Sequence, residues 1–317
     1  MKRWLEGIDM KKVLVTGGAG FVGTHLTKRL CDEMDVTVFD RERKVQIDDR
    51  AKYIRGDITD YLSLARAFEE TKPDLVFHLA GMVSRRECEE TPLMAFQTNM
   101  MGAYNICELC VRYHARVIYA GSSEEYGHGF TDTKVTETSS FGPATGIYSL
   151  SKRFADEVIQ HFAAQKGLTA TAVRFFMLYG PGEPANTYRS VVIRFVDHAL
   201  KGQLLPVHEG TSRSWCYIDD AIEALMLLSQ REQVQPFELY NIGKNDPIET
   251  VELAKIILQM TGRTYGIEIT EREQTIIPHK SADFSKIKSI LGWEATTPLE
   301  TGLWHVIRHE MRMKERY

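Results

Sequence analysis

The sequence predicts an α/β protein, a doubly wound parallel sheet with a smaller α+β lobe at its C-terminal end. Three observations support this prediction. Short and almost continuously apolar runs alternate with amphipathic helical segments up to about residue 180, as in a parallel sheet with both faces covered. A glycine-rich turn follows the first apolar run. After residue 180 the alternation becomes irregular.

The first apolar run, 11–18, precedes a helical segment at 21–33 in which Val22, Leu26 and Leu30 recur at every fourth position. The same order of strand and helix continues along the chain. Further strands are expected at 36–40, 52–58, 74–81, 116–123 and 170–180, and further helices near 60–71, 92–113 and 146–166. Because crossovers between parallel strands are right-handed, a sheet wound in both directions from its centre is the economical topology.

The less regular C-terminal part predicts helices near 188–201, 219–230, 248–261, 283–291 and 298–314, with strands at 204–207, 238–242 and 266–270. We assign residues 1–180 to a cofactor-binding domain and residues 181–317 to a substrate-binding lobe, from which a segment such as 236–247 can return to the first domain. Ligands of open parallel sheets lie outside the carboxyl ends of the strands, so a lobe placed there closes a cleft.

The composition limits the possible partners. The 317 residues are 43% apolar and carry a formal net charge of −4, so we expect no nucleic-acid or anionic-membrane partner. The chain has no apolar run of membrane-spanning length, and its N-terminal stretch lacks the apolar core of a signal peptide. The five cysteines and ten histidines have no spacing typical of a disulfide framework or a metal site. We therefore expect a cytoplasmic protein without a metal.

The glycines of the first turn have the spacing of a dinucleotide-binding motif. Gly17 permits a tight turn, Gly20 lets the backbone approach a pyrophosphate, and Gly23 lets the helix pack close to the strand. The helix then presents free N–H groups and a partial positive charge to the phosphates. The sequence thus predicts a Rossmann-like cofactor site.

Asp40 ends the second predicted strand, about 20 positions after the first glycine. A carboxylate at this place binds a ribose 2′-hydroxyl and repels a 2′-phosphate, which favours NAD over NADP. Arg41 follows directly and keeps NADP as the alternative.

Tyr148 and Lys152 are four residues apart on one face of a predicted helix. An ammonium a few ångströms away can lower the pKa of a phenol, so the pair can take a proton from a hydroxyl while a hydride leaves for a nicotinamide. Ser122 and Ser123 follow a predicted strand and are expected above the cofactor, where a hydroxyl can bond to the substrate oxygen.

Taken in order, these motifs resemble the extended short-chain dehydrogenase/reductase family, in its nucleotide-sugar epimerase/dehydratase branch. The matching stretches cover nearly the whole chain: TGGAGFVG (16–23), FD (39–40), GDITD (56–60), VFHLAG (76–81), SSEEYG (122–127), YSLSK (148–152), RFFMLYGPGE (174–183), RSWCYIDD (213–220) and 281–303. The resemblance implies bound NAD, a nucleoside-diphosphate sugar as substrate, and a homodimer formed by the two long helices after the fourth and fifth strands.

The resemblance also implies roles for single residues. Tyr148 is the base, Lys152 positions the ribose and tunes the tyrosine, and Ser122 is the catalytic hydroxyl. The further cofactor contacts that it implies are Phe21, Val22, Asp57, Ile58, Leu79, Ala80, Gly81 and Asn99, and the substrate contacts are Ser84, Ser122, Met177 and Arg213. The chain departs from the family pattern at Met177, where the family usually has Asn, and at Glu125, where it usually has an apolar residue.

The implied first step is oxidation of the sugar at C4 by NAD. C4 epimerisation is the favoured outcome. The alternative is a 4,6-dehydratase in which Glu124 removes the C5 proton. UDP-glucuronate decarboxylases have a glutamate at the place of Glu124, although their tyrosine motif differs from YSLSK. A decarboxylase therefore remains open, as does a 4-ketosugar reductase. Outside this branch, a non-catalytic NAD(P)-sensing protein and a reductase of free carbonyl compounds remain as further alternatives.

Overall fold

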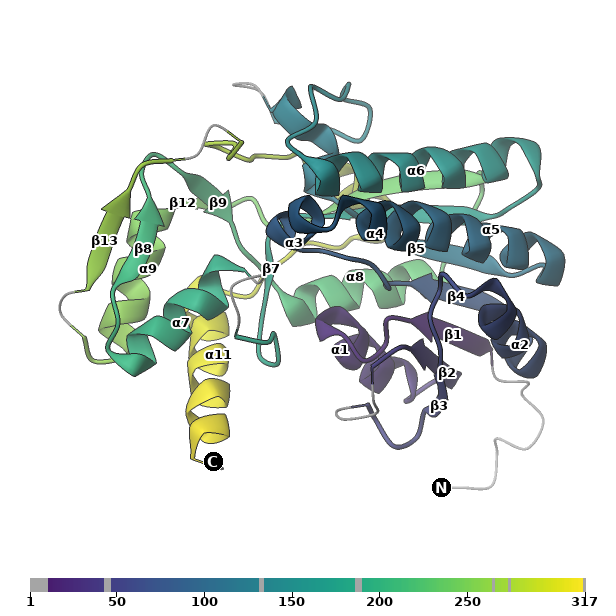
Figure 1. Ribbon diagram of the computed structural model, residues 1–317, viewed down its shortest axis with the longest axis horizontal. Helices are drawn as coiled ribbons and strands as arrows, with labels where there is room; N and C mark the ends of the chain where they lie inside the picture. The colour runs from purple at the N-terminus through teal and green to yellow at the C-terminus, as the bar shows by residue number, and fades with distance from the viewer. Residues whose placement is uncertain are drawn as a thin grey trace.

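The centre of the molecule is a seven-stranded sheet in which every strand pairing is parallel, in the order β11-β6-β5-β4-β1-β2-β3. The computed structural model describes residues 11–42, 47–130, 134–185, 190–263, 266–272 and 275–315. The predicted doubly wound sheet is confirmed (Figure 1). Its strands are β1 (Lys12–Thr16), β2 (Asp35–Asp40), β3 (Lys52–Arg55), β4 (Leu75–His78), β5 (Arg116–Ser122), β6 (Ala170–Phe175) and β11 (Phe237–Ile242).

Helices cover both faces of the sheet, as Figure 1 shows. One face carries α2 (Tyr61–Thr71), α5 (Gly102–Tyr113) and α6 (Ile147–Gln165), and the other carries α1 (Phe21–Leu30), α8 (Ile218–Gln230) and α10 (Ser285–Leu291). Along β1, Val13 and Val15 pack into one apolar cluster and Leu14 into the other. Successive strand residues point to opposite faces, which is why the consecutive residues 13–15 of this strand are all apolar.

The smaller lobe lies beyond one end of the sheet (Figure 1). Its helices are α7 (Val191–Lys201), α9 (Thr250–Met260) and α11 (Leu299–Lys314). Three short pairs of strands complete it: β8 (Leu205–His208) with β13 (Ile267–Thr270), β9 (Ser212–Ser214) with β12 (Pro247–Glu249), and β7 (Leu178–Tyr179) with β10 (Cys216–Tyr217). The chain returns from this lobe to the main sheet, where β11 pairs with β6. No helix in the described part of the chain is long and apolar enough to cross a membrane.

The segment expected as one helix at 92–113 is interrupted. It consists of α4 (Pro92–Phe96), a π-helical turn at Gln97–Met101 and then α5. The wider turn contains buried Asn99, whose amide bonds to both the N–H and the carbonyl oxygen of Met82, at 2.8 and 3.0 Å. A single π turn inside a helix often serves such a local requirement. The apolar periodicity that predicted the helix is the same in either form. Two short helices, α3 (Arg85–Glu90) and a 3₁₀ segment at Ser123–Gly129, were not predicted.

Candidate active site

A cleft of about 1070 Å³ opens at the carboxyl ends of the central strands, between the sheet and the smaller lobe. We call its two sides the cofactor wall and the sugar wall. The cofactor wall consists of the turns after β1, β2, β3 and β4. The sugar wall consists of the start of α3, the end of β5, the start of α6 and segments of the smaller lobe.

The glycine turn of the cofactor wall has no room for side chains. Gly17 has φ +73°, and a Cβ atom there would lie 2.5 Å from the backbone nitrogen of Ala80. A Cβ atom on Gly23 would lie 2.2 Å from the carbonyl oxygen of Gly17. Glycine is therefore required at both positions, for the backbone conformation in one case and for close packing in both. At Gly20 the nearest atom would be 3.2 Å away, so that position is less strict.

Helix α1 begins beside this turn with its N–H groups uncapped. Its N-cap residue is Gly20, no side chain caps it, and its first turn has no acidic residue, while Lys28 and Arg29 stand in its last turn. The helix dipole is thus left to attract an anion at the N-terminus. Together with the glycine turn, this arrangement fits the pyrophosphate of a dinucleotide.

Asp40 lies at the end of β2, where the sequence predicted a ribose-binding carboxylate. It is buried in the cleft wall and accepts hydrogen bonds from the N–H groups of Ala19, at 2.9 Å, and Glu42, at 3.0 Å. Each carboxylate oxygen keeps a lone pair for a ribose hydroxyl. Arg41 also lines the cleft, but its side chain is half exposed and lies 3.7 Å from Glu42.

Most of the other expected cofactor contacts also reach the cleft. The lining includes Phe21, Val22, Asp57, Ile58, Leu79, Ala80 and Gly81. Asn99 does not line it. Its amide lies behind the wall, where it holds the Met82 backbone and donates to Ser151 at 2.9 Å. Since a Cβ on Gly81 would be 2.9 Å from the Asn99 Oδ1 atom, Asn99 supports the turn after β4 from behind.

Tyr148 and Ser122 meet on the sugar wall. Tyr148 lies in the first turn of α6 and Ser122 at the end of β5, and both line the cleft. Burial raises the pKa of the Tyr148 phenol, and a hydrogen bond with the Ser122 hydroxyl opposes this shift. The two hydroxyls thus form a pair that can hold one substrate oxygen between them.

Lys152 follows one turn later on α6. Its ammonium donates to the Ala120 carbonyl oxygen at 2.8 Å and lies 4.9 Å from the centroid of the Tyr119 ring. Burial lowers its pKa to about 8, against the charge of Glu125, which raises it. We expected Lys152 to lower the pKa of the Tyr148 phenol. In the structure, burial of the Tyr148 side chain has the largest effect, and the pKa of that phenol is raised.

Glu124 forms a buried ion pair with Lys280, which the sequence had not singled out. One carboxylate oxygen of Glu124 accepts from the Lys280 ammonium, and the other accepts from the Thr145 hydroxyl at 3.1 Å. Burial raises the pKa of Glu124, but Lys280 and Arg85 outweigh it and bring that pKa to about 2. Burial lowers the pKa of Lys280 to about 8. Lys280 lies 156 positions from Glu124 in a segment without periodicity, so no local signal identified it.

Arg213 supports the segment that carries Lys280. Its guanidinium donates to the carbonyl oxygens of Ser212 and Pro278, both at 2.7 Å, and Ile277, at 2.6 Å. Burial lowers its pKa to about 10. Arg213, which is expected to meet a substrate diphosphate, is among the residues that line the cleft, and its guanidinium anchors the chain beside Lys280.

Three expected site residues remain to be placed. Ser84 lines the cleft, and its hydroxyl caps α3 by accepting from the Glu87 N–H at 3.1 Å. Met177 lines it with φ +39°, in the left-handed region that disfavours most side chains. Ser123 is buried beneath the wall and is not part of the cleft lining, because the 3₁₀ turn that starts there presents its neighbours instead.

Comparison with known proteins agrees with this geometry. Residues 13–243 match the model of the "NAD dependent epimerase/dehydratase family". UDP-glucuronic acid decarboxylase 6 of Arabidopsis thaliana is 32% identical to this chain, over 92% of this chain and 86% of that protein.

Solved structures of the same kind superpose over most of the chain. UDP-glucose 4-epimerase of Thermotoga maritima, solved with UDP-glucose, has a TM-score of 0.90 and 26% identity, and the match covers 95% of this chain and 99% of that one. MoeE5, solved with UDP-glucuronic acid and NAD, has a TM-score of 0.86 and 27% identity with the same coverage. Because the family model matches well over half of the residues of this chain, the chain belongs to the NAD dependent epimerase/dehydratase family, whose cofactor is NAD.

Proposed function

We propose that this enzyme oxidises a nucleoside-diphosphate hexuronic acid at C4 and then releases the sugar carboxylate as carbon dioxide. The charge of the sugar wall is the observation that carries the proposal. Apart from Lys152, and from Arg86, which is exposed and pairs with Glu90, the described lining of this side contains two carboxylates, Glu124 and Glu183, against the cations Arg85, Arg194, Arg213 and Lys280. A half-buried surplus of positive charge needs anions, and a diphosphate with one sugar carboxylate supplies them.

The first step uses Tyr148, Ser122 and Lys152. Bound NAD would accept the hydride from C4 and later return it. The Tyr148 phenolate takes the proton of the C4 hydroxyl, and the Ser122 hydroxyl donates to the same oxygen. Because burial raises the pKa of Tyr148, the phenolate needs positive charge nearby, and we assign this role to the Lys152 ammonium, one turn further along α6 and also in the cleft lining.

The second step follows from the chemistry of a 4-keto uronic acid. Its carboxylate is β to the ketone, so the C5–C6 bond breaks, carbon dioxide leaves, and the electron pair forms an enolate whose oxygen is at C4. Tyr148 and Ser122 stabilise that oxygen by donating to it. A proton must then be added to C5. The Lys280 ammonium, with a pKa lowered to about 8, is acidic enough to supply it near neutral pH.

The ion pair of Glu124 weighs against a 4,6-dehydratase. That reaction needs Glu124 to take a proton from C5, and a carboxylate with a pKa of about 2 is a weak base. Decarboxylation and C4 epimerisation do not need a base at C5. Curated relatives named as decarboxylases of UDP-uronic acids further support the first of these two.

C4 epimerisation is the second candidate function. It needs only the group of Tyr148, Ser122 and Lys152, all of which line the cleft. One superposed structure is named as a UDP-glucose 4-epimerase, which supports this reaction. MoeE5 was solved with UDP-glucuronic acid, which supports a nucleotide sugar as the substrate. In this case the 4-keto sugar rotates in the cleft and accepts the returning hydride on the opposite face of C4.

One incubation distinguishes the two functions. The holoenzyme is mixed with UDP-glucuronic acid, and separately with UDP-glucose, and the products are analysed by mass spectrometry and by sugar chromatography. A product lighter by one carbon dioxide supports decarboxylation. A product of unchanged mass but new retention time supports C4 epimerisation. Turnover of UDP-glucose alone would contradict the hexuronic acid as substrate.

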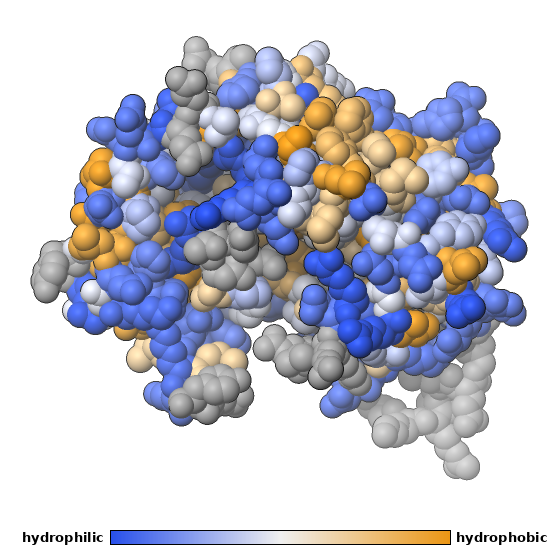
Figure 2. All heavy atoms as spheres, in the orientation of Figure 1, coloured by the Kyte–Doolittle hydropathy of each residue, from blue (hydrophilic) through white to orange (hydrophobic). Residues whose placement is uncertain are grey.

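We also propose a homodimer through α4, α5 and α6. Apolar side chains gather on this face of the molecule (Figure 2), and the exposed ones on or beside these helices are Leu93, Met94, Met101, Tyr104 and Phe154. A group of this size on one face is typical of a protein interface. Sedimentation of the wild type and of the variant Leu93→Glu/Phe154→Glu tests it, and a monomeric wild type would contradict it.

A further inference from the structure

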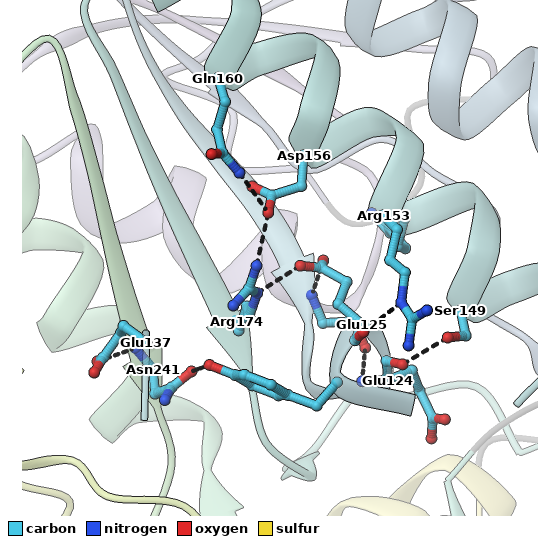
Figure 3. Close-up of polar contacts among 12 residues, drawn as sticks. Glu124, Glu125, Glu137, Ser149, Arg153, Asp156, Gln160, Arg174 and Asn241 are labelled. Carbon is cyan, nitrogen blue, oxygen red and sulfur yellow. Dashed lines mark hydrogen bonds and ion pairs between the residues drawn. The ribbon is translucent and has the colours of Figure 1, made fainter. Parts of the chain in front are cut away.

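A buried cluster of charges lies directly behind the sugar wall (Figure 3). Arg174 on β6 contacts two carboxylates, Glu125 at 2.6 Å and Asp156 on α6, also at 2.6 Å. The three side chains are at most 2% exposed. The guanidinium also lies 4.7 Å from the centroid of the Tyr126 ring. The reaction steps proposed above assign no part to these residues, and burying three charges costs free energy that apolar side chains of similar size would not cost.

Glu125 is the member that reaches the catalytic strand. Its Oε1 atom accepts from the Ser122 N–H at 2.8 Å, and a Cβ on Gly121 would lie 2.7 Å from that same oxygen. The carboxylate therefore fixes the backbone at the end of β5, where Ser122 presents its hydroxyl to Tyr148 and where the Ala120 carbonyl holds Lys152.

The cluster has two carboxylates for one guanidinium. Burial and the charge of Asp156 raise the pKa of Glu125 to about 7, while Arg174 lowers it. The charged or titratable groups that face Glu125 are Arg174 from β6, Tyr119 from β5, and Tyr148, Lys152, Arg153 and Asp156 from α6. Arg153 donates to the main-chain oxygen of Glu125, at 2.5 Å, so it is directed at the backbone.

We propose that Glu125 is a positioning residue for the reaction, which holds the backbone of Ser122 in place and supplies the negative charge that keeps Lys152 protonated beside Tyr148. This rests on the roles proposed above for Ser122, Tyr148 and Lys152. Burial alone lowers the pKa of Lys152, and Glu125 is the foremost group that opposes it. The residue is also one of the two departures from the sequence pattern that the chain resembles.

The test compares Glu125→Gln with Asp156→Asn. Each variant removes one of the two carboxylates that contact Arg174 and keeps the ion pair of Arg174 with the other carboxylate, so both variants are expected to fold. Glu125→Gln removes the charge that supports Lys152. We expect the alkaline limb of the kcat–pH profile to shift to lower pH by about one to two units, which is the effect of one partly screened charge a few ångströms away. In Asp156→Asn we expect the limb to stay or to move up, because Glu125 then ionises more readily.

A third variant, Glu125→Val, measures the hold on Ser122. It removes the acceptor of the Ser122 N–H, which the amide oxygen of Gln can replace. We expect a kcat lower than that of Glu125→Gln at every pH, with the two alkaline limbs at the same pH. Equal loss of kcat in all three variants without movement of a limb would reduce Glu125 to a structural role and overturn the proposal.

A measurement without substrate separates this proposal from the proposed function. The pKa of Lys152 is followed by NMR of ¹³C-labelled lysine side chains, with the Lys152 signal assigned from the spectrum of Lys152→Met. We expect that pKa to fall in Glu125→Gln and not in Asp156→Asn. If it is the same in the wild type and both variants, Glu125 does not support Lys152, whatever sugar the enzyme uses.

Discussion

The two walls of the cleft are built in different ways. The cofactor wall is formed by backbone: Gly17 and Gly23 allow close approach, and the N-terminus of α1 is left uncapped. The sugar wall is formed by charged side chains, of which Glu124 and Lys280 come from positions 156 residues apart. One wall fits a ligand by its shape and its N–H groups, and the other by charges that must be held in pairs.

This difference decides how each wall responds to change. The turn at Gly17 and Gly23 tolerates no added atom, so its failures are steric, and Asp40 adds one carboxylate to the same wall. A site made of buried charges fails when one partner is lost, because the other is left unpaired in a poor solvent for ions.

Removal of the Tyr148 hydroxyl should show the largest difference between the two walls, because it should lower kcat and leave NAD affinity nearly unchanged. In Tyr148→Phe we expect kcat to fall by about 10²–10⁴-fold, the usual contribution of a general base, while NAD affinity measured by fluorescence titration stays within a few-fold. Tyr126→Phe is the matched control, since that phenol bonds to Asn241 at 2.8 Å outside the cleft lining. A Tyr148→Phe enzyme with near-normal kcat would remove this tyrosine from the base position.

Loss of Lys280 should damage both stability and the sugar wall. Lys280→Met leaves the Glu124 carboxylate buried without its ion-pair partner, which costs about 3–5 kcal/mol in typical cases. In denaturant titrations the double variant Glu124→Gln/Lys280→Met should recover most of this loss, and NAD affinity should be unchanged in both. Equal stability of the single and the double variant would show that the pair does not act as a unit.

The same pair predicts a dependence of stability on pH. The pKa of Glu124 is lowered from 4.5 to about 2 in the folded protein, so its contribution is present above about pH 4.5 and is lost as the pH falls toward 2. Denaturant titrations between these values should show the wild type losing more stability than Glu124→Gln/Lys280→Met. Parallel losses in the two proteins would contradict the lowered pKa.

The cofactor wall can be tested with two glycines of similar conformation. Gly17 and Gly210 have φ +73° and +63°, but a Cβ would meet Ala80 at the first position and nothing within 4 Å at the second. Each change to Ala should cost about 1–2 kcal/mol for the left-handed backbone. Only Gly17→Ala should also weaken NAD binding, as measured by calorimetry. Equal NAD affinity in both variants would mean that the close approach at Gly17 is not required.

The smallest effect is expected at Met177, where a left-handed residue lies on the sugar wall. Asn adopts this conformation more readily than Met. Met177→Asn should therefore raise the stability by about 0.5–1 kcal/mol, seen as a small rise of Tm. A lower Tm would show that the thioether makes packing contacts that outweigh the strain.

The same contrast explains what could be predicted from the sequence. The strands, the glycine turn and Asp40 were predictable because their signals are local: an apolar run, a fixed spacing, an acid at the end of a strand. Tyr148 and Lys152 were predictable from their spacing on one helix. Lys280 and the roles of Glu125 and Arg174 were not, because their partners meet only when distant segments fold together. Ser123 and Asn99 do not reach the cleft for a different, local reason: they lie in a 3₁₀ turn and a π turn, which the sequence pattern did not distinguish from a loop and an α-helix.

The return of β11 to the main sheet has a consequence for dissecting the protein. A fragment ending at residue 180 would lack β11 and α8, which cover one edge and part of one face of the sheet. The outermost strand on that side would then be β6, whose unpaired N–H and carbonyl groups favour self-association. The two lobes are thus not interchangeable modules, and shuffling one of them between homologues should require carrying the 237–242 strand with the part it completes.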